Sequence, residues 1–171
     1  KGTIIRFNDN KKVVWKNNFY SKTEKKIHPT LSFAITDKNL LVADSIAKIS
    51  NIDLQSGDLI WSKKSEYPFN SEIKIHKDKF FVADFKNTLR CFYLKDGSEC
   101  WNIKTEESFT VSNSKFSILI RDNLVIYNNS LGDITAIDIS SGLIEWQLPT
   151  QKSSIINETY SFNFSRLVSD G

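Results

Sequence analysis

Four tryptophans at nearly even spacing constrain the fold more than any other feature of this sequence. Trp15, Trp61, Trp101 and Trp146 lie 46, 40 and 45 residues apart. A spacing this regular indicates an internal repeat, in which each unit is one supersecondary motif that packs against its neighbours. We therefore expect a series of similar units along the chain.

A turn signature precedes these tryptophans and is preserved to different degrees. It combines an acidic residue and a serine, whose side chains accept hydrogen bonds from nearby amides, with a glycine that adopts the positive φ of a hairpin loop. The third copy keeps Gly97 before Trp101, and the first copy keeps only Trp15. The best-preserved copies are Asp53, Ser56 and Gly57 before Trp61, and Asp138, Ser141 and Gly142 before Trp146. The signature predicts a β-hairpin that presents one large indole for packing.

Short strand patterns separated by turn residues fill the rest of each repeat. Leu40–Ala43 is a compact apolar run, which suits an inner strand covered on both faces. Four short antiparallel strands per repeat are typical of a propeller blade, although the strand count alone also allows a sandwich. A sandwich gives no reason for one tryptophan per period. The predicted fold is therefore all-β, an arc of about four blades from a β-propeller of seven or eight blades.

The same patterns predict how the chain divides. The polar segment 17–30 is expected to be a connector, in which Lys22–Lys26 forms a solvated loop, and no window shows sustained helical periodicity. We expect a single β-propeller fragment over residues 1–171, composed of a half blade at 1–17, blades at 31–62, 71–103 and 115–148, and the start of a further blade at 160–171.

Charge and hydropathy exclude two classes of function. The net charge is +3, and 23 basic residues are interspersed with 20 acidic residues without forming a basic stripe, so we expect no nucleic-acid partner. No apolar run approaches the length of about 18 residues that a membrane-spanning helix needs. The chain begins at Lys1 and contains no methionine, which indicates a mature portion or a fragment.

The residue types that carry catalysis do not form a recognisable site. His28 and His76 are the two histidines, and neither has a cysteine or carboxylate at metal-ligand spacing. Glycine-rich phosphate loops and Gly-x-Ser-x-Gly sequences are absent. Turn capping or solvent exposure accounts for most acidic residues. We therefore predict no catalytic, cofactor-binding or metal-binding residues, and no cofactor.

The two cysteines flank the third turn and allow two arrangements. A four-residue loop brings Cys91 opposite Cys100, where a cross-strand disulfide is within reach. A three-residue loop instead places Cys91 opposite Trp101 and directs the two sulfurs to opposite faces. Both a disulfide and two buried free thiols therefore remain open.

The turn signature resembles the tryptophan-docking motif of the PQQ-like (quinoprotein-type) β-propeller family, Ala-x-Asp-x-x-Thr-Gly-x-x-x-Trp. The segment 136–146 matches this pattern with Ser141 at the threonine position, whereas the second copy has Asn51 and the third Cys91 at the alanine position. The resemblance covers most of the chain. It implies that each tryptophan locks its blade to a neighbouring blade, through Trp15, Trp61, Trp101, Trp146, Gly57, Gly97, Gly142, Asp53 and Asp138.

Within this family the chain is most similar to the BamB-type lipoproteins of the outer-membrane β-barrel assembly machinery. That resemblance implies a non-catalytic periplasmic scaffold, anchored at the outer membrane by a lipid that the sequence given does not include, with a β-barrel assembly component as its protein partner. Two alternatives are a fragment of a PQQ-dependent dehydrogenase, whose catalytic residues lie outside this chain, and a luminal stress-sensor propeller. The chain lacks the vicinal cysteine pair that is usual in the dehydrogenases.

Two further expectations concern surfaces. Aromatic residues on the connectors are candidate anchors for a protein partner, unless they simply cover the blade ends. These residues are Tyr67, Phe69, Phe109 and Tyr160. An open arc exposes apolar faces at its terminal blades, so we also expect two copies to associate about a two-fold axis and complete a ring, with residues 1–16 and 160–171 near the junction.

Overall fold

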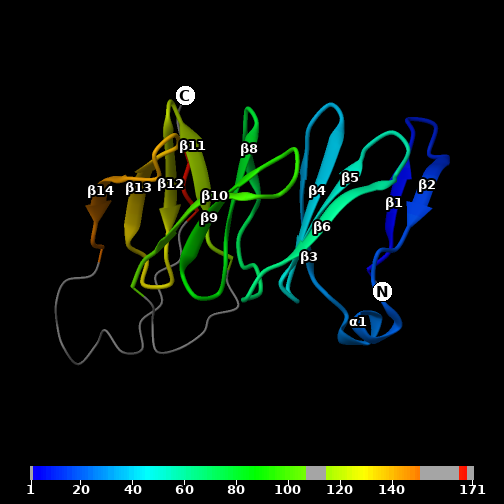
Figure 1. Ribbon diagram of the computed structural model, residues 1–171, viewed down its shortest axis with the longest axis horizontal. Helices are drawn as coiled ribbons and strands as arrows, with labels where there is room; N and C mark the ends of the chain where they lie inside the picture. The colour runs from blue at the N-terminus through cyan, green and yellow to red at the C-terminus, as the bar shows by residue number, and fades with distance from the viewer. Residues whose placement is uncertain (1, 107–114, 151–165, 169–171) are drawn as a thin grey trace. The chain divides into compact units, whose positions relative to one another are not determined.

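The structure is a computed structural model that describes residues 2–106, 115–150 and 166–168 (Figure 1). The chain is divided into two compact units, Lys1–Phe69 and Asn70–Gly171. Antiparallel strands dominate both units, and each strand pairs with its neighbour in sequence. The predicted all-β fold with four-stranded antiparallel sheets is confirmed.

The first unit contains two sheets and one short helix. The order β1-β2 forms a two-stranded sheet, and β3-β4-β5-β6 forms a four-stranded sheet. The helix α1 lies in the connector between the two sheets. The bounds are β1 (Ile4–Phe7), β2 (Val13–Asn17), α1 (Lys22–Ile27), β3 (Leu31–Ile35), β4 (Asn39–Asp44), β5 (Lys48–Asp53) and β6 (Leu59–Lys64).

The described part of the second unit contains two four-stranded sheets with the same connectivity, β7-β8-β9-β10 and β11-β12-β13-β14. A bridge between Ser71 and Phe116 joins the segments that precede the two sheets. The bounds are β7 (Lys74–His76), β8 (Lys79–Ala83), β9 (Thr88–Tyr93), β10 (Glu99–Lys104), β11 (Ile118–Arg121), β12 (Leu124–Asn128), β13 (Ile134–Asp138) and β14 (Ile144–Leu148).

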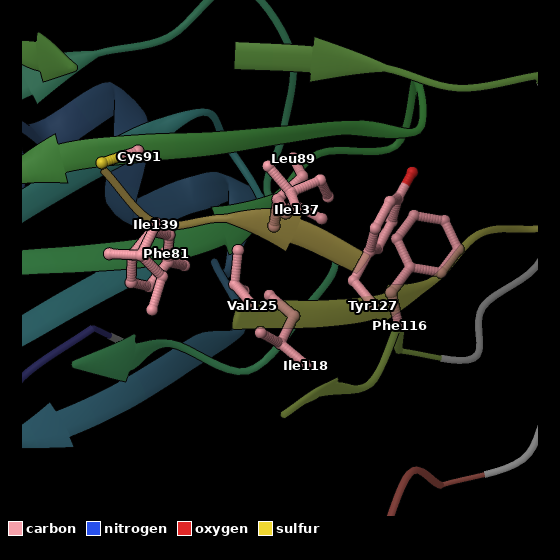
Figure 2. Close-up of a cluster of buried hydrophobic side chains, with 10 residues drawn as sticks. Phe81, Leu89, Cys91, Phe116, Ile118, Val125, Tyr127, Ile137 and Ile139 are labelled. Atoms are coloured by element: carbon pink, nitrogen blue, oxygen red, sulfur yellow. The ribbon is translucent and has the colours of Figure 1, made fainter. Parts of the chain in front are cut away.

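Burial falls from the inner strands of a sheet to its outer strand. In β4 the apolar run from Leu40 to Ala43 is buried, as the sequence predicted, whereas β14 is exposed along its whole length. In the second unit the inner strands of both sheets supply one core cluster, part of which Figure 2 shows, including Phe81, Tyr127 and Ile137. Burial of these apolar side chains between the two sheets stabilises the packing of one sheet on the other.

One prediction for the first connector is wrong. Residues 22–26 form most of a helix, not a solvated loop. The cause is a capping box, because the Ser21 side chain accepts from the Glu24 amide and the Glu24 carboxylate accepts from the Ser21 amide. His28 ends the helix in the left-handed conformation, with φ of 57°.

Every hairpin that carries a tryptophan contains a β-bulge just before it. In β5–β6, Asn51 faces Trp61 and Ile52 faces Leu59, so Ile60 is an extra residue without its own partner. A bulge places two residues opposite one and increases the local twist of the strand. The extra residues in the four hairpins are Val14, Ile60, Cys100 and Glu145.

Candidate functional site: tryptophan contacts, buried turns and an apolar groove

In the first unit, Trp15 of β2 lies against the turn that joins β5 and β6. Its indole Nε1 donates a hydrogen bond to the carbonyl oxygen of Leu54 at 3.0 Å. A methyl group added to Gly57 would lie 2.6 Å from Trp15 Cδ2, so only glycine allows the ring to approach this closely. Asn17 of the same strand donates to the Gly57 carbonyl oxygen at 2.7 Å. The tryptophan of one sheet is thus held by the turn of the next.

The second unit repeats this arrangement with different residues. Trp101 Nε1 donates to the carbonyl oxygen of Ile139 at 3.1 Å, and a methyl group on Gly142 would lie 2.6 Å from Trp101 Cγ. The Trp101 ring also packs against Phe81, with ring centroids 5.7 Å apart. The acceptor carbonyl comes one residue after the signature aspartate in both units, so the same backbone position receives the indole.

The signature aspartates shape these turns. Asp138 Oδ1 accepts hydrogen bonds from the amides of Ser140 and Ser141 at 3.0 and 2.8 Å. The Ser140 hydroxyl, the Ser141 amide and the Ser141 hydroxyl lower the pKa of Asp138. Asp53 accepts from the amides of Ser56 and Gln55 in the same way, and its pKa is also lowered. Each carboxylate therefore holds the turn in the form that presents the acceptor carbonyl.

The other signature residues are placed as follows. Trp61 is half-buried, and Gly97 has a positive φ of 65°. Trp146 is 44% exposed, although its own turn is the best-preserved copy of the signature. A well-preserved turn therefore does not ensure that the tryptophan of the same hairpin is buried.

A second set of repeated turns was not recognised as a signature from the sequence. The Asp44 Oδ1 atom accepts from the amides of Ile46 and Lys48 at 2.9 and 2.8 Å. Asp84 and Asn129 follow their inner strands in the same way and cap equivalent turns. The recurrence of Val-Ala-Asp at the ends of two inner strands was the available signal.

The two buried aspartates of these turns are satisfied by protein groups. The Tyr20 hydroxyl donates to Asp44 Oδ2 at 2.6 Å, and burial together with that carboxylate raises the pKa of Tyr20. Arg90 Nε lies 3.1 Å from Asp84 Oδ2 and donates to it. Because each carboxylate is engaged on both oxygen atoms, these groups stabilise the turns and are poorly suited to act as bases or metal ligands.

The first unit also contains an apolar groove of about 450 Å³. Phe33 and Ile35 of β3 line it and are 50% and 64% exposed. Within the described residues, the adjacent strand β1 pairs only with β2 and leaves its other edge open. The lining residues are Thr3, Ile4, Ile5, Arg6, Phe7, Trp15, Phe33, Ile35, Leu40 and Leu54. A concave surface with exposed aromatic and aliphatic side chains has the composition found at the centre of protein interfaces.

Two of the four predicted aromatic anchors on the connectors, Tyr67 and Phe69, lie within the described residues. Phe69 is buried, with 6% exposed, and its amide donates to the Asp44 carbonyl oxygen, which favours the alternative that it covers a blade end. Tyr67 is half-buried. Phe109 and Tyr160 lie outside the described residues, and so does most of the predicted junction segment 160–171. The exposed apolar residues of the groove were missed because they lie on a strand and not on a loop.

The cysteine register differs from both predicted arrangements. Phe92 faces Glu99 as a four-residue loop requires, but the bulge at Cys100 then places Trp101 opposite Cys91. Both cysteines are free thiols in this structure, Cys91 buried and Cys100 half-buried. The two side chains pack against the same core cluster, because a bulge and not a three-residue loop produces the Cys91–Trp101 register.

Metal-binding and membrane-spanning features were also considered. Among the described residues, no three His, Cys, Asp or Glu side chains are grouped so that they could hold a metal ion. His28 caps the helix and His76 ends β7. The structure describes no helix that has both the length and the apolar character needed to cross a membrane.

The repeated four-stranded antiparallel sheets, each with a tryptophan hairpin as its outer pair, define the chain as part of a β-propeller built from PQQ-like repeats. The family model described as outer membrane protein assembly factor BamB matches residues 1–171. The chain therefore belongs to the BamB family, and the resemblance inferred from the turn signature is confirmed.

Solved structures agree on the fold. BamB from Moraxella catarrhalis is 17% identical with a TM-score of 0.68, over 86% of this chain and 42% of that one. The computationally designed Ika4 protein is 15% identical with a TM-score of 0.57, over 70% of this chain and 72% of that one. A quinohemoprotein alcohol dehydrogenase from Comamonas testosteroni is 20% identical with a TM-score of 0.57, over 68% of this chain and 20% of that one. The chain thus spans less than half the length of this BamB, and no curated protein matches its sequence.

Proposed function

We propose that this chain is a non-catalytic protein-interaction scaffold of the machinery that assembles β-barrel proteins in the outer membrane. The observation that carries the proposal is the match of the assembly-factor family to residues 1–171. The proposed location is the periplasm, with attachment to the outer membrane through a lipid anchor. The proposed partner is a component of the same assembly machinery.

The side chains described above are consistent with such a scaffold. The buried carboxylates Asp44 and Asp84 are occupied by protein donors, which leaves little capacity for acid–base chemistry there. The contacts of Trp15 and Trp101 are proposed to hold successive blades in a rigid order. A rigid propeller presents its surface residues to a partner without a large entropic cost of ordering them.

A binding measurement tests the scaffold proposal and maps the surface. The immobilised periplasmic domain of the β-barrel assembly subunit from the same organism should bind the purified chain saturably. Ile35→Asp, which places a charge in the apolar groove, should weaken binding at least about tenfold if the groove is at the interface. The matched control is Ile27→Asp on α1, where the isoleucine is 60% exposed and does not line the groove. An absence of binding by the unmodified chain contradicts the scaffold proposal, and equal effects of the two variants place the interface elsewhere.

A second candidate is a piece of a quinone-dependent dehydrogenase. The observation that favours it is the shared fold with the quinohemoprotein alcohol dehydrogenase and with a europium-containing methanol dehydrogenase, which is 13% identical with a TM-score of 0.59 over 72% of this chain and 26% of that one. Absorbance spectra of the chain mixed with pyrroloquinoline quinone and calcium distinguish the candidates. A quinone that stays with the protein through gel filtration supports the dehydrogenase and contradicts the scaffold.

We also propose that two copies associate. Apolar side chains exposed along β14, including Ile144, Trp146 and Leu148, offer a surface that a second copy would bury. Light scattering at micromolar concentration should give the mass of a dimer, and Trp146→Lys should shift it towards the monomer. A monomeric mass for the unmodified chain contradicts this proposal.

A further inference from the structure

The two cysteines of the second unit lie next to each other across the bulge of β9 and β10. Cys91 faces Trp101, and Cys100 is the extra residue that precedes Trp101. Because a bulge sets two residues opposite one, Cys100 and Trp101 both approach Cys91. Both pack against the core cluster that contains Cys91, and the Cys91 and Cys100 side chains are hydrogen-bonded to each other.

We propose that Cys91 and Cys100 are a reversible redox pair, which closes to an intramolecular disulfide when a small-molecule disulfide such as glutathione disulfide is present. These are the two cysteines of the chain, so within one molecule neither has another thiol to pair with. The structure holds the reduced form, and thiols already in side-chain contact need little movement to reach bonding geometry. This property goes beyond the proposed scaffold function and does not depend on it.

The surroundings of the two sulfurs determine the order of the steps. Cys91 is fully buried, whereas Cys100 is half-buried and reachable by a small oxidant. Burial raises the pKa of both thiols, but the hydrogen bond with Cys91 and the nearby Lys79 ammonium act to lower the pKa of Cys100. Cys100 is therefore the first thiolate to form and the attacking group.

The proposed chemistry is two successive thiol–disulfide exchanges. The Cys100 thiolate attacks one sulfur of glutathione disulfide, which breaks that S–S bond, forms a mixed disulfide and releases one glutathione thiolate. Cys91 loses its proton to solvent, and its thiolate attacks Cys100 Sγ and releases the second glutathione thiolate. The protein dithiol is oxidised by two electrons and one glutathione disulfide is reduced to two glutathiones.

The bond would act on the tryptophan contact described above. It would tie the outer strand β10 to β9 at the position of Trp101, whose indole packs on Phe81 and reaches Ile139. Linking the strands here would restrict how far Trp101 can leave this site when the sheet opens. The oxidised protein is therefore expected to melt about 5 °C higher than the reduced protein.

Intact mass spectrometry of the folded chain, equilibrated with increasing ratios of glutathione disulfide to glutathione, tests the proposal. The expected result is the loss of two hydrogens and of both titratable thiols, reversed by dithiothreitol. A stable glutathione adduct on Cys100, a disulfide-linked dimer or unchanged free thiols at the most oxidising ratio would each overturn it.

The repeat supplies matched variants that keep the fold. Cys91→Ala and Cys100→Ile each introduce the residue found at the equivalent position of another hairpin, Ala136 and Ile60, and each should abolish the mass loss. In a chain that carries both changes, Ala136→Cys with Glu145→Cys transfers the pair to the hairpin of β13 and β14. This variant should again lose two hydrogens, and its failure to do so would contradict the bulge geometry as the cause.

Discussion

Trp15 and Trp146 occupy the same position in their hairpins but have opposite environments. Trp15 is 8% exposed and donates to Leu54 of the following sheet, whereas Trp146 is 44% exposed. The turn of the Trp15 hairpin is the most degenerate copy of the signature, and that of the Trp146 hairpin is the best preserved. Within one hairpin, the degree to which the turn signature is preserved therefore does not predict how deeply the tryptophan is buried.

The contacts explain this difference. A turn with the Asp-x-x-Ser-Gly pattern receives the tryptophan of the preceding sheet, as the turns at Gly57 and Gly142 receive Trp15 and Trp101. The degenerate turn at 8–11 therefore does not predict the burial of Trp15, because Trp15 packs against the turn at Gly57. In these two cases, the turn and the tryptophan that it receives come from different sheets.

The largest expected effect separates the two tryptophans directly. Trp15→Ala should lower the free energy of unfolding by about 3–5 kcal/mol, because it empties a buried site and leaves the Leu54 carbonyl without its indole donor. At a protein concentration low enough to keep the chain monomeric, Trp146→Ala should cost about 1 kcal/mol or less, since 44% of its surface is then in water. Urea denaturation followed by circular dichroism measures both. Equal losses would show that the difference in exposure has no energetic counterpart.

The receiving glycine should be nearly as sensitive as the tryptophan. Gly142→Ala is expected to cost about 2–4 kcal/mol, since the residue has φ of +73° and the new methyl group would meet the Trp101 ring. Ser141→Ala in the same turn is the control, with an expected loss of about 1 kcal/mol or less. Thermal unfolding of the two variants gives the comparison, and a Gly142→Ala protein as stable as Ser141→Ala would contradict the close approach.

The third prediction compares the stability contributed by the Trp15 contact with that of another buried contact in the first unit, the Tyr20–Asp44 hydrogen bond. Tyr20→Phe removes the hydroxyl donor from the buried Asp44 carboxylate and should cost about 1.5–3 kcal/mol. The loss should shrink in an Asp44→Asn background, because a neutral amide is less costly to leave unpaired. Urea denaturation of the four proteins measures this coupling. A Tyr20→Phe loss that is the same in both backgrounds would mean that the hydroxyl acts elsewhere.

The smallest expected effect is a pH dependence of the turn itself. The pKa of Asp138 is lower in the folded chain than its ordinary value of 3.8, so its stabilising contribution is present above that value and disappears as pH falls through the folded pKa. Asp138→Asn should therefore melt slightly below the unmodified protein at neutral pH, and the two melting temperatures should converge in acid. A difference in melting temperature that widens in acid would contradict the lowered pKa of Asp138.

The repeat and its strands were predictable because period-two apolar patterns and turn residues act locally. The inner strand predicted at residues 40–43 differs from β4 by one residue at each end. The helix α1 was missed because a single capping box, Ser21 to Glu24, outweighs weak periodicity over six residues. The serine and glutamate of this capping box are visible in the sequence, but the prediction of a solvated loop considered only the charges of residues 22–26.

The details of the candidate site were less predictable because they depend on contacts between distant segments. The burial of Phe69 follows from its connector packing at the end of the sheet near Asp44. The bulge at Cys100 changes the register after the pair Phe92 and Glu99, and no single residue type marks this bulge in the sequence.

The most direct test of the central claim is a pair of double-mutant cycles on Gly57. If the turn at Gly57 serves the preceding sheet, the cost of Gly57→Ala should fall by about 1–3 kcal/mol in a Trp15→Ala background, because the new methyl group no longer meets an indole. In a Trp61→Ala background, where the tryptophan of the same hairpin is removed, the cost should stay unchanged within about 0.5 kcal/mol. Coupling to Trp61 in place of Trp15 would contradict the account.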